Sequence, residues 1–235
     1  MKDIRNMSQE QIAELVVALG EKAFRSKQIF DWVSKGVSSF DEMTNVSAAL
    51  REKLAQVCSI DNYKIVEELK AKDGTVKVLG ALKDGNVVES VFMTYKHGHS
   101  ACISTQVGCK MKCTFCASTI GGVVRSLTAG EYIGQIFALQ NLTGERVNNV
   151  VLMGSGEPLD NYDETVRFIK MATNPLGLNM SIRNITLSTC GLVPEIYKLA
   201  DEKFGITLAI SLHNPFQEER EEIMQIGRAS CRERV

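Results

Sequence analysis

Several markers that would assign a chain to a broad class are missing from this 235-residue sequence. The formal net charge is only -1, which excludes a uniformly basic nucleic-acid-binding protein but allows a local basic patch. The N-terminal stretch MKDIRNMSQEQ has no apolar segment, so no signal peptide is expected. No apolar run approaches the ~20 residues that a membrane span needs. We therefore expect a cytoplasmic protein with no membrane partner.

Internal repeats and low-complexity tracts are also missing. Hydrophobic residues make up 44% of the chain, which is enough for one sizeable core, or for a core and a small accessory domain.

Cysteine, in contrast, is plentiful and clustered. Four cysteines fall within the segment from 102 to 116. Thiols stay reduced in the cytoplasm, so such a cluster is typical of a metal-binding or catalytic site rather than of a disulfide framework. The seven cysteines are Cys58, Cys102, Cys109, Cys113, Cys116, Cys190 and Cys231.

The first sixty residues have helical patterns. Ser8 and Gln11 form a capping box in front of apolar residues at helical spacing, and Gly20 ends that run. Further helices are expected over about 25–35 and from Ser47 onward. We interpret residues 1–60 as a helical N-terminal accessory domain.

Short β-rich runs follow at 63–69, 75–82 and 86–93. Asp73-Gly74 and Asp84-Gly85 separate them, and Asp-Gly is a strong hairpin signal. Residues 61–94 are therefore predicted to form an antiparallel β meander that leads into the core.

Strands and helices then alternate. Strands are expected at 101–107, 148–154, 184–190 and 206–212, each followed by a helix, and this rhythm predicts an α/β fold with a parallel sheet or barrel. Ligands of such folds collect at the C-terminal ends of the strands. The cysteine loop and the segments GSGEP, STCG and SLHNP all follow strand ends, so we expect them to converge on one face.

The three cysteines of the loop have C-x3-C-x2-C spacing. Three thiolates on one short loop can bind three irons of a [4Fe–4S] cluster and leave the fourth iron open for chemistry. The alternatives are a structural zinc site and unrelated buried cysteines. Zinc sites usually have four ligands with paired C-x2-C hooks, whereas here only Cys113 and Cys116 have that spacing, and Cys102 lies inside a predicted strand.

The ordered motifs carry a resemblance. The segments ESVFMTYKHGHSACISTQVGCKMKCTFCASTIGG, GSGEP, LSTCG and AISLHNPFQEEREEIM resemble the RlmN/Cfr family of radical S-adenosylmethionine (SAM) RNA methyltransferases over residues 1–224. The resemblance implies a partial (β/α) barrel with four of about six βα units. The radical SAM core would be residues 95–225, incomplete at its C-terminal end.

The resemblance also implies the roles of individual residues. The cluster ligands would be Cys109, Cys113 and Cys116. Residues matching SAM-contacting positions of the family are Gly156, Glu157, Ser188, Ser211, Leu212 and His213. Taken alone, the GSGEP segment could be a strand-ending turn, Ser188 an ordinary strand-end hydroxyl and His213 a core histidine. Cys190 corresponds to no family role and is interpreted as a small buried residue.

Two further positions match catalytic residues of the family. Glu89 corresponds to the proton acceptor, and Cys102 to a second catalytic thiol that releases methylated RNA from a covalent adduct by forming a disulfide bond with a methyl-carrying cysteine. Each has a simpler alternative: Glu89 could face solvent from a strand, and Cys102 could be a core cysteine.

The implied activity is methylation of C2 of an adenosine in 23S rRNA near the peptidyl-transferase centre and in certain tRNAs. The cofactors would be a [4Fe–4S] cluster and SAM, with an electron donor such as flavodoxin or ferredoxin, in a monomer. Alternatives are a C8-methylating antibiotic-resistance homologue, a radical SAM enzyme for a small molecule or peptide, and a non-catalytic zinc-stabilised RNA-binding protein.

Acidic residues are missing altogether from residues 90–130, around the cysteine loop. An acid-free stretch would favour the approach of RNA phosphates, although it could be a local fluctuation in composition. The basic residues in this window are Lys96, His97, His99, Lys110, Lys112 and Arg125.

The resemblance fails abruptly after Met224, at QIGRASCRERV. We expect residues 226–235 to be a non-native tail, and we do not transfer the methyl-carrier role to Cys231. Such a chain is expected to assemble a cluster and cleave SAM at most, without methylating RNA.

Overall fold

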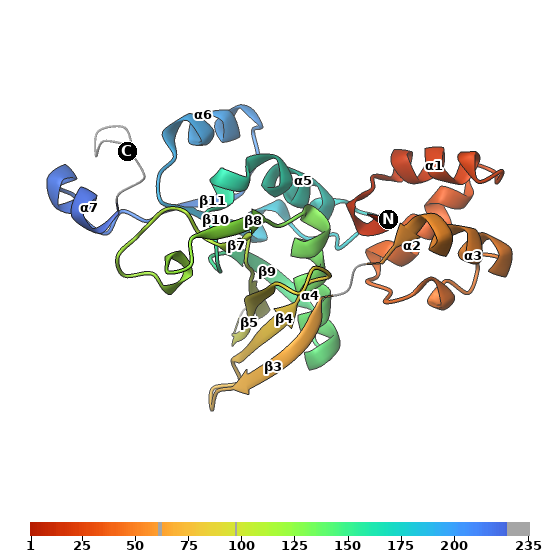
Figure 1. The fold of residues 1–235 in the computed structure, drawn as a ribbon, viewed down its shortest axis with the longest axis horizontal. Coiled ribbons are helices and arrows are strands. Elements are labelled where there is room, and N and C mark those ends of the chain that lie inside the picture. The colour runs from red at the N-terminus through yellow and green to blue at the C-terminus, as the bar shows by residue number, and fades with distance from the viewer. Residues whose placement is uncertain (61–62, 97, 225–235) are drawn as a thin grey trace.

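The computed structural model describes residues 1–60, 63–96 and 98–224. Its buried apolar residues form one cluster between Ile4 and Cys58, a larger one between Tyr63 and Leu199, and a small third one around Cys109, Cys113 and Met224. The N-terminal helices and α7 lie at opposite ends of the long axis (Figure 1). The expected tail and Cys231 fall outside the described residues.

The N-terminal unit contains the helices that the sequence predicts: α1 (Gln9–Ala18), α2 (Arg25–Ser34) and α3 (Ala48–Val57). The capping box is present, since Ser8 Oγ accepts from Gln11 N at 3.2 Å and Gln11 Oε1 accepts from Ser8 N at 2.9 Å. Two short parallel strands, β1 (Lys2–Asp3) and β2 (Cys58–Ser59), close the unit and were not anticipated.

The core is a seven-stranded sheet with the order β11-β10-β9-β6-β5-β4-β3. The antiparallel half is the expected meander: β3 (Lys64–Lys70), β4 (Val76–Ala81) and β5 (Val87–Tyr95). Its hairpin turns have Gly74 and Gly85 at φ of 86° and 83°, a conformation that glycine adopts without steric cost. β5 continues the antiparallel pairing onto β6, so the meander and the core share one sheet.

The other half of the sheet is parallel: β6 (Gly98–Cys102), β9 (Val147–Leu152), β10 (Ile185–Thr189) and β11 (Thr207–Ile210). The helices that follow these strands are α4 (Ala129–Thr143), α5 (Tyr162–Thr173), α6 (Val193–Asp201) and α7 (Gln217–Ile223). These four βα units confirm the predicted α/β fold.

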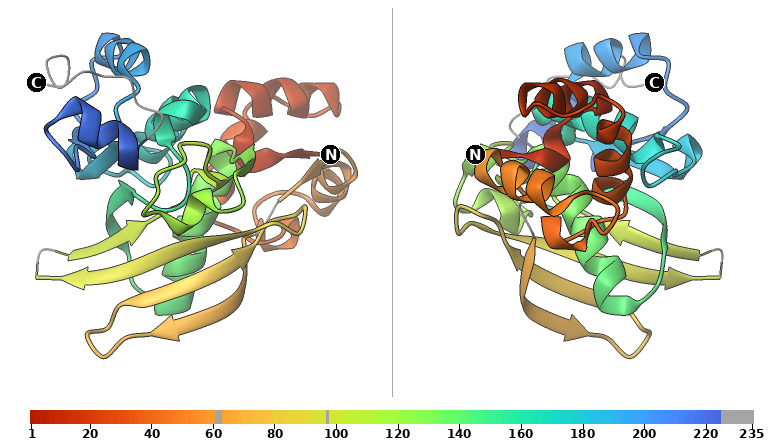
Figure 2. Two further views of the ribbon diagram at one scale, coloured as in Figure 1. Left: turned by 60° about the vertical axis from the view of Figure 1, so that its left-hand side comes forward. Right: turned by 90° about the vertical axis from the view of Figure 1, so that its right-hand side faces the viewer.

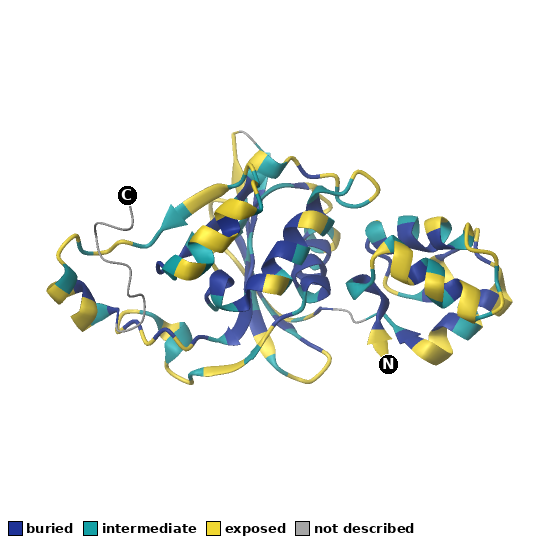
Figure 3. Cartoon of the chain, turned by 90° about the horizontal axis from the view of Figure 1, so that it is seen from above, coloured by how far each residue is buried: buried dark blue, intermediate teal, exposed yellow. Residues whose placement is uncertain are grey.

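The core lies on one face of the sheet. Alternate residues of β4 and β5, such as Val78, Val88 and Phe92, are buried in the same cluster as Tyr132 and Ile136 of α4. Each such fully buried side chain contributes roughly 1.5–3 kcal/mol. α4 crosses this face (Figure 2), and buried residues concentrate where the sheet meets α4 and α5 (Figure 3).

The prediction of one strand over 101–107 is wrong in one respect, because this segment belongs to two separate strands. β6 ends at Cys102, and β7 (Gln106–Gly108) pairs with β8 (Val123–Ser126) in a separate small sheet. Between them, the N–H groups of Thr105 and Gln106 both donate to the carbonyl of Ser155, at 2.8 and 3.1 Å. The backbone of 105–106 thus binds the loop after β9 instead of continuing the β6–β9 pairing. The chain leaves the main sheet at this point and enters the small β7–β8 sheet.

The N-terminal unit contacts the core through the start of α4. Asn6 Oδ1 accepts from Gly130 N at 2.7 Å, and Asn6 Nδ2 donates to Thr128 Oγ1 at 3.2 Å. The N–H of Gly130 is in the first turn of α4 and has no acceptor within the helix. The side chain of Asn6, from the N-terminal unit, supplies that acceptor. The domain boundaries themselves stay a prediction.

Candidate functional site

A cavity of about 320 Å³ lies at the C-terminal ends of the parallel strands. Its wall is formed by the cysteine loop, the GSGEP loop after β9 and the ends of β10 and β11. These are the segments that the sequence predicts to converge. The lining residues among the predicted site are Cys109, Cys113, Cys116, Gly156, Glu157, Ser188, Ser211 and His213.

Backbone hydrogen bonds hold the cysteine loop closed. Cys109 N donates to Gly122 O at 3.1 Å, which joins the two ends of the loop, and Cys116 N donates to Cys113 O at 3.1 Å. Thr119 Oγ1 donates to the carbonyls of Cys113 and Cys116 at 3.2 and 2.8 Å. Three thiols are therefore presented to one cavity by a short loop with internal support.

The cysteine thiols are costly to ionise in the metal-free chain. Burial raises the pKa of Cys109 and of Cys113, and the nearby charge of Glu157 raises both further. A bound cation that ligates thiolates offsets this cost. Among the described residues, no group of three His, Cys, Asp or Glu side chains is arranged to hold a single metal ion. In a [4Fe–4S] cluster each thiolate binds its own iron, so the sulfur atoms need not meet at one point.

The GSGEP loop lies so close to the segment after β6 that two of its positions accept only glycine. A Cβ on Gly154 would fall 2.7 Å from Ser104 N, and a Cβ on Gly156 would fall 2.6 Å from Thr105 Oγ1. Gly156 also has φ of 106°, which L side chains rarely adopt. The two glycines therefore let the GSGEP loop pack directly against the segment after β6, and their backbone lines the cavity.

Glu157 follows this loop and is 4% exposed. Its Oε1 accepts from Leu159 N at 3.0 Å and its Oε2 accepts from Cys190 N at 2.8 Å. Burial raises the pKa of Glu157, while these two N–H groups act against that rise. A buried carboxylate in the wall of the cavity is suited to a cationic group, because an opposite charge restores its preference for the ionised form.

The ends of β10 and β11 contribute hydroxyl and imidazole groups. Ser188 Oγ and Ser211 Oγ are 3.3 Å apart, and the His213 ring packs on Phe115 with centroids 4.4 Å apart. His213 therefore belongs to the cavity wall and not to the core. Its backbone has φ of 55°, and its ring contacts the cysteine loop through Phe115. Leu212 lies beside the cavity with 39% exposure instead of in its wall.

Glu89 and Cys102 stand on the sheet face opposite to α4, outside the cavity wall. Cys102 pairs directly with Val91, two residues along β5 from Glu89, so both side chains project from the same face. Glu89 Oε2 lies 2.5 Å from Lys77 Nζ. Burial raises the pKa of the Cys102 thiol, and the charge of Glu89 adds to the rise. All six described cysteines are free, so none of these residues forms the expected disulfide bond.

The structure adds two residues that sequence reasoning missed. Cys190 lines the cavity and packs with Cys109 and Cys113, although it was interpreted only as a small buried residue. Arg220 on α7 is fully buried beside the same wall. The sequence offered one signal for Arg220, namely a single arginine among four glutamates over 218–222.

The acid-free window of the sequence is not acid-free in space. Three of its basic side chains pair with carboxylates brought from elsewhere: Lys110 with Asp160, Arg125 with Asp84 and Glu131, and His99 with Glu145. Among the described residues Lys96 and Lys112 have no such partner, and His97 lies outside them. The window therefore offers less positive potential to RNA than its sequence indicates.

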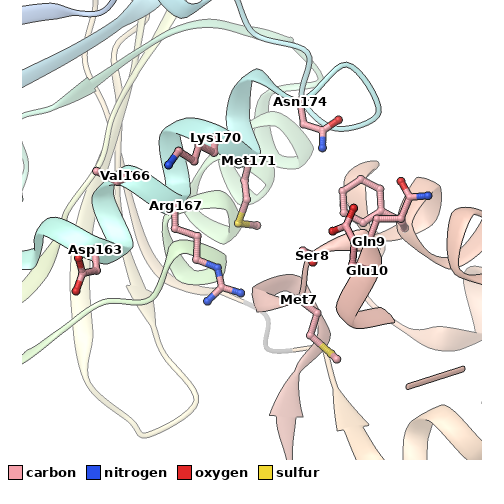
Figure 4. Close-up of a pocket in the computed structure, with 11 residues that line it drawn as sticks. Met7, Ser8, Gln9, Glu10, Asp163, Val166, Arg167, Lys170, Met171 and Asn174 are labelled. Carbon is pink, nitrogen blue, oxygen red and sulfur yellow. The ribbon is translucent and has the colours of Figure 1, made fainter. Parts of the chain in front are cut away.

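A second cavity, of about 440 Å³, lies between the start of α1 and α5. Figure 4 shows Arg167 and Lys170 of α5 across from Ser8 and Glu10. Lys170 pairs with Glu202 at 3.0 Å and Arg167 with Glu164 at 3.8 Å. The described residues of its wall include no cysteine or histidine, so the chemistry of the chain concentrates at the smaller cavity.

Comparison with known proteins places this geometry in a family. Residues 2–60 match the ribosomal RNA large subunit methyltransferase N-terminal domain, and residues 103–235 match the radical SAM superfamily. A probable dual-specificity RNA methyltransferase RlmN from Alkaliphilus oremlandii is 55% identical over 96% of this chain and 66% of its own length. Another from Thermoanaerobacter sp. is 48% identical over 97% of this chain and 67% of its own length. The chain belongs to the RlmN family of the radical SAM superfamily.

The fold agrees with this assignment. A crystal structure of a radical SAM methyltransferase from Sphaerobacter thermophilus superposes with a TM-score of 0.90 at 36% identity, and the match covers 96% of this chain and 67% of that one. The chain spans 66% and 64% of the lengths of two RlmN relatives from Alkaliphilus.

Membership of the radical SAM superfamily implies a [4Fe–4S] cluster and SAM as cofactors. The donor set of the cavity fits them. Three thiols stand on one loop, Gly154 and Gly156 line the same cavity, and the buried carboxylate of Glu157 belongs to its wall.

Proposed function

We propose that this chain is part of an enzyme that methylates C2 of an adenosine in 23S rRNA near the peptidyl-transferase centre, and of adenosine in certain tRNAs. One observation supports this proposal above the others: a single cavity unites the three loop cysteines with the GSGEP loop and the ends of β10 and β11. The same chain also matches the N-terminal domain of ribosomal RNA methyltransferases.

The residues of the cavity have distinct proposed roles. Cys109, Cys113 and Cys116 would hold the cluster, because their thiols are the three donors of the closed loop. When bound, the cluster and SAM supply the one-electron chemistry that an unreactive aromatic carbon needs. Glu157 would bind a cationic group of SAM.

The rest of the cavity would position SAM and keep water out. Gly156 would let the backbone approach the cofactor, and Ser188 and Ser211 would donate hydrogen bonds from adjacent strand ends. His213 would orient the cofactor from the wall. Leu212 would contribute its backbone, whose N–H donates to Ile210 O and whose carbonyl accepts from Asn214 N in the turn after β11.

Glu89 and Cys102 would act on the RNA side of the reaction. Glu89 would accept a proton from the substrate base, which requires it to release Lys77. Cys102 would act as the second catalytic thiol. Cys102 pairs in the sheet with Val151 of β9, two residues before Met153 of the cavity wall, which supports a place near the reacting atoms. A methylated cysteine intermediate belongs to the same proposal.

Two alternatives compete with this proposal: a C8-methylating homologue and a zinc-stabilised RNA-binding protein. A cytoplasmic monomer that takes electrons from flavodoxin or ferredoxin, with residues 1–60 contacting RNA, is proposed by analogy with the family. No helix in the described part of the chain is long and apolar enough to cross a membrane.

Anaerobic purification of the chain tests the proposal. A brown protein that contains iron and sulfide and binds SAM supports it, and so does 2-methyladenosine in rRNA from a deletion strain that is complemented with the complete enzyme. A colourless protein that contains zinc would contradict it in favour of the binding protein. Mass spectrometry of the RNA distinguishes C2 from C8 methylation.

A further inference from the structure

Arg220 is a buried charged side chain that none of the proposed roles uses. It is 0% exposed, whereas its neighbours Glu219 and Glu221 on α7 are exposed. Arginine is almost never fully buried unless its donors find partners. The direction of this side chain into the protein is therefore fixed by specific contacts.

Those contacts are backbone carbonyls of two different loops. Nε donates to Leu212 O at 3.1 Å, in the loop after β11. Nη2 donates to Cys190 O, in the loop after β10, and more weakly to Ser211 O at 3.5 Å. Because a guanidinium presents its donors in a rigid planar fork, one arginine joins both loops at a fixed spacing.

Both loops belong to the wall of the candidate cofactor cavity. The loop after β10 follows Ser188 and contains Cys190, whose N–H binds Glu157. The loop after β11 begins at Ser211, whose hydroxyl faces that of Ser188. Arg220 therefore holds together the part of the cavity wall that the ends of β10 and β11 form.

The helix that carries Arg220 also reaches the cysteine loop. Ile223 O accepts from Thr114 N at 3.0 Å, and Met224 is buried against Cys109 and Cys113. One element thus contacts all three segments, and its only fully buried charge, among the described residues, is Arg220.

We propose that Arg220 is a positioning residue for SAM, which fixes the two strand-end loops at the spacing that admits the cofactor. This inference rests on the proposed function. Hydrogen bonds from a charged donor to buried carbonyls are strong, and a wall held in place before binding spares the cost of ordering it when the cofactor arrives. Arg220 would not ligate iron, so its loss should leave the cluster intact.

The test compares Arg220→Met, Arg220→Lys and the control Arg146→Met in the anaerobically reconstituted chain. Arg146 is a suitable control because its Nη2 also donates to a backbone carbonyl, that of Leu178, away from the cavity. For each protein, iron and sulfide per chain are measured, then SAM affinity by equilibrium dialysis. The electron paramagnetic resonance spectrum of the reduced cluster is recorded with and without SAM.

Arg220→Met is expected to keep full iron and sulfide while its SAM dissociation constant rises about tenfold, the loss expected for a charged hydrogen bond. Arg220→Lys should fall in between, because an ammonium keeps the charge but lacks the fork. Arg146→Met should match the parent chain. Parent-like SAM affinity in Arg220→Met, or in Arg220→Lys where the methionine variant does not fold, would overturn the inference.

A failure of the proposed function gives a different result. In that case the parent chain itself takes up no iron or binds no SAM. Hydrogen exchange in the metal-free chain then tests the inference alone: Arg220→Met should speed exchange at 188–192 and 211–214, and unchanged exchange there would overturn it.

Discussion

The carboxylate of Glu157 accepts a hydrogen bond of 2.8 Å from the backbone N–H of Cys190, a residue on the neighbouring strand end. Its other oxygen accepts from Leu159 N at 3.0 Å, so both carboxylate oxygens are hydrogen-bonded to backbone N–H groups. The same residue also lines the cavity. Glu157 is thus part of the frame of the site before any cofactor binds. A substitution at Glu157 therefore has two separate effects: loss of the hydrogen bonds to Leu159 N and Cys190 N, and loss of a contact with the cofactor.

Replacing Glu157 by Ala is expected to raise the SAM dissociation constant about tenfold or more while iron and sulfide stay at parent levels. The same variant should lower the free energy of unfolding of the metal-free chain by about 1–3 kcal/mol, because two buried N–H groups lose their acceptor. Urea denaturation and SAM binding measure the two effects separately.

Glu157→Gln removes the charge of the side chain while keeping its shape. A glutamine accepts at one oxygen only and turns an NH₂ group toward the other N–H, so stability should fall even though the shape is kept. Unchanged SAM affinity in both variants would remove Glu157 from the cofactor site.

The three loop cysteines should each be indispensable for the cluster. Cys109→Ala, Cys113→Ala and Cys116→Ala are expected to abolish iron uptake, because three ligands leave none to spare. Cys58→Ala is the control: that thiol is also free and buried, but it belongs to the N-terminal hydrophobic cluster. A full iron complement in any of the three loop variants would refute the ligand assignment.

Cys102→Ala should behave differently, because Cys102 lies outside the cavity wall. We expect normal iron content and normal SAM cleavage, with RNA remaining covalently attached to the complete enzyme. Gel electrophoresis followed by nuclease treatment detects such an adduct. Normal turnover of this variant would remove the catalytic role from Cys102 and leave it a half-buried residue of a strand.

Arg125 joins the hairpin turn after β4 to the start of α4. Its Nε lies 2.6 Å from Asp84 Oδ2 and its Nη2 lies 2.7 Å from Glu131 Oε1. The hydrogen bond from Arg125 holds the pKa of Asp84 well below its usual range. Because the pKa is lowered in the folded state, the stabilisation is present above the unfolded-state pKa of about 3.9 and is lost as the pH falls.

Asp84→Asn should therefore lower the free energy of unfolding at pH 7 by less than about 1 kcal/mol, since the pair is partly exposed and screened. The difference from the parent chain should shrink below about pH 4 and in high salt. Asp73→Asn is the control, because the carboxylate of Asp73 accepts from Thr75 N in the preceding hairpin. Equal losses at pH 7 and pH 2.5 would contradict the role of the ion pair.

Much of the local structure could be predicted from the sequence. Helix starts such as Ser8 and Thr128 depend on side chains three residues away, and hairpin turns depend on adjacent Asp-Gly pairs. The convergence of the cysteine loop with the strand-end motifs was also predictable, because parallel strands direct all their C-terminal ends to one edge.

Only the tertiary structure decided the rest. Four features join residues at least 30 positions apart: the break after Cys102, where Thr105 and Gln106 bind Ser155, and the contacts of Glu157 with Cys190, of Arg220 with Cys190 and of Arg125 with Asp84. Such contacts depend on which strands become neighbours and at what register. The spacing of residues along the sequence does not reveal these neighbours, because hydrophobic periodicity indicates which face of an element a residue occupies but not which residue it contacts there.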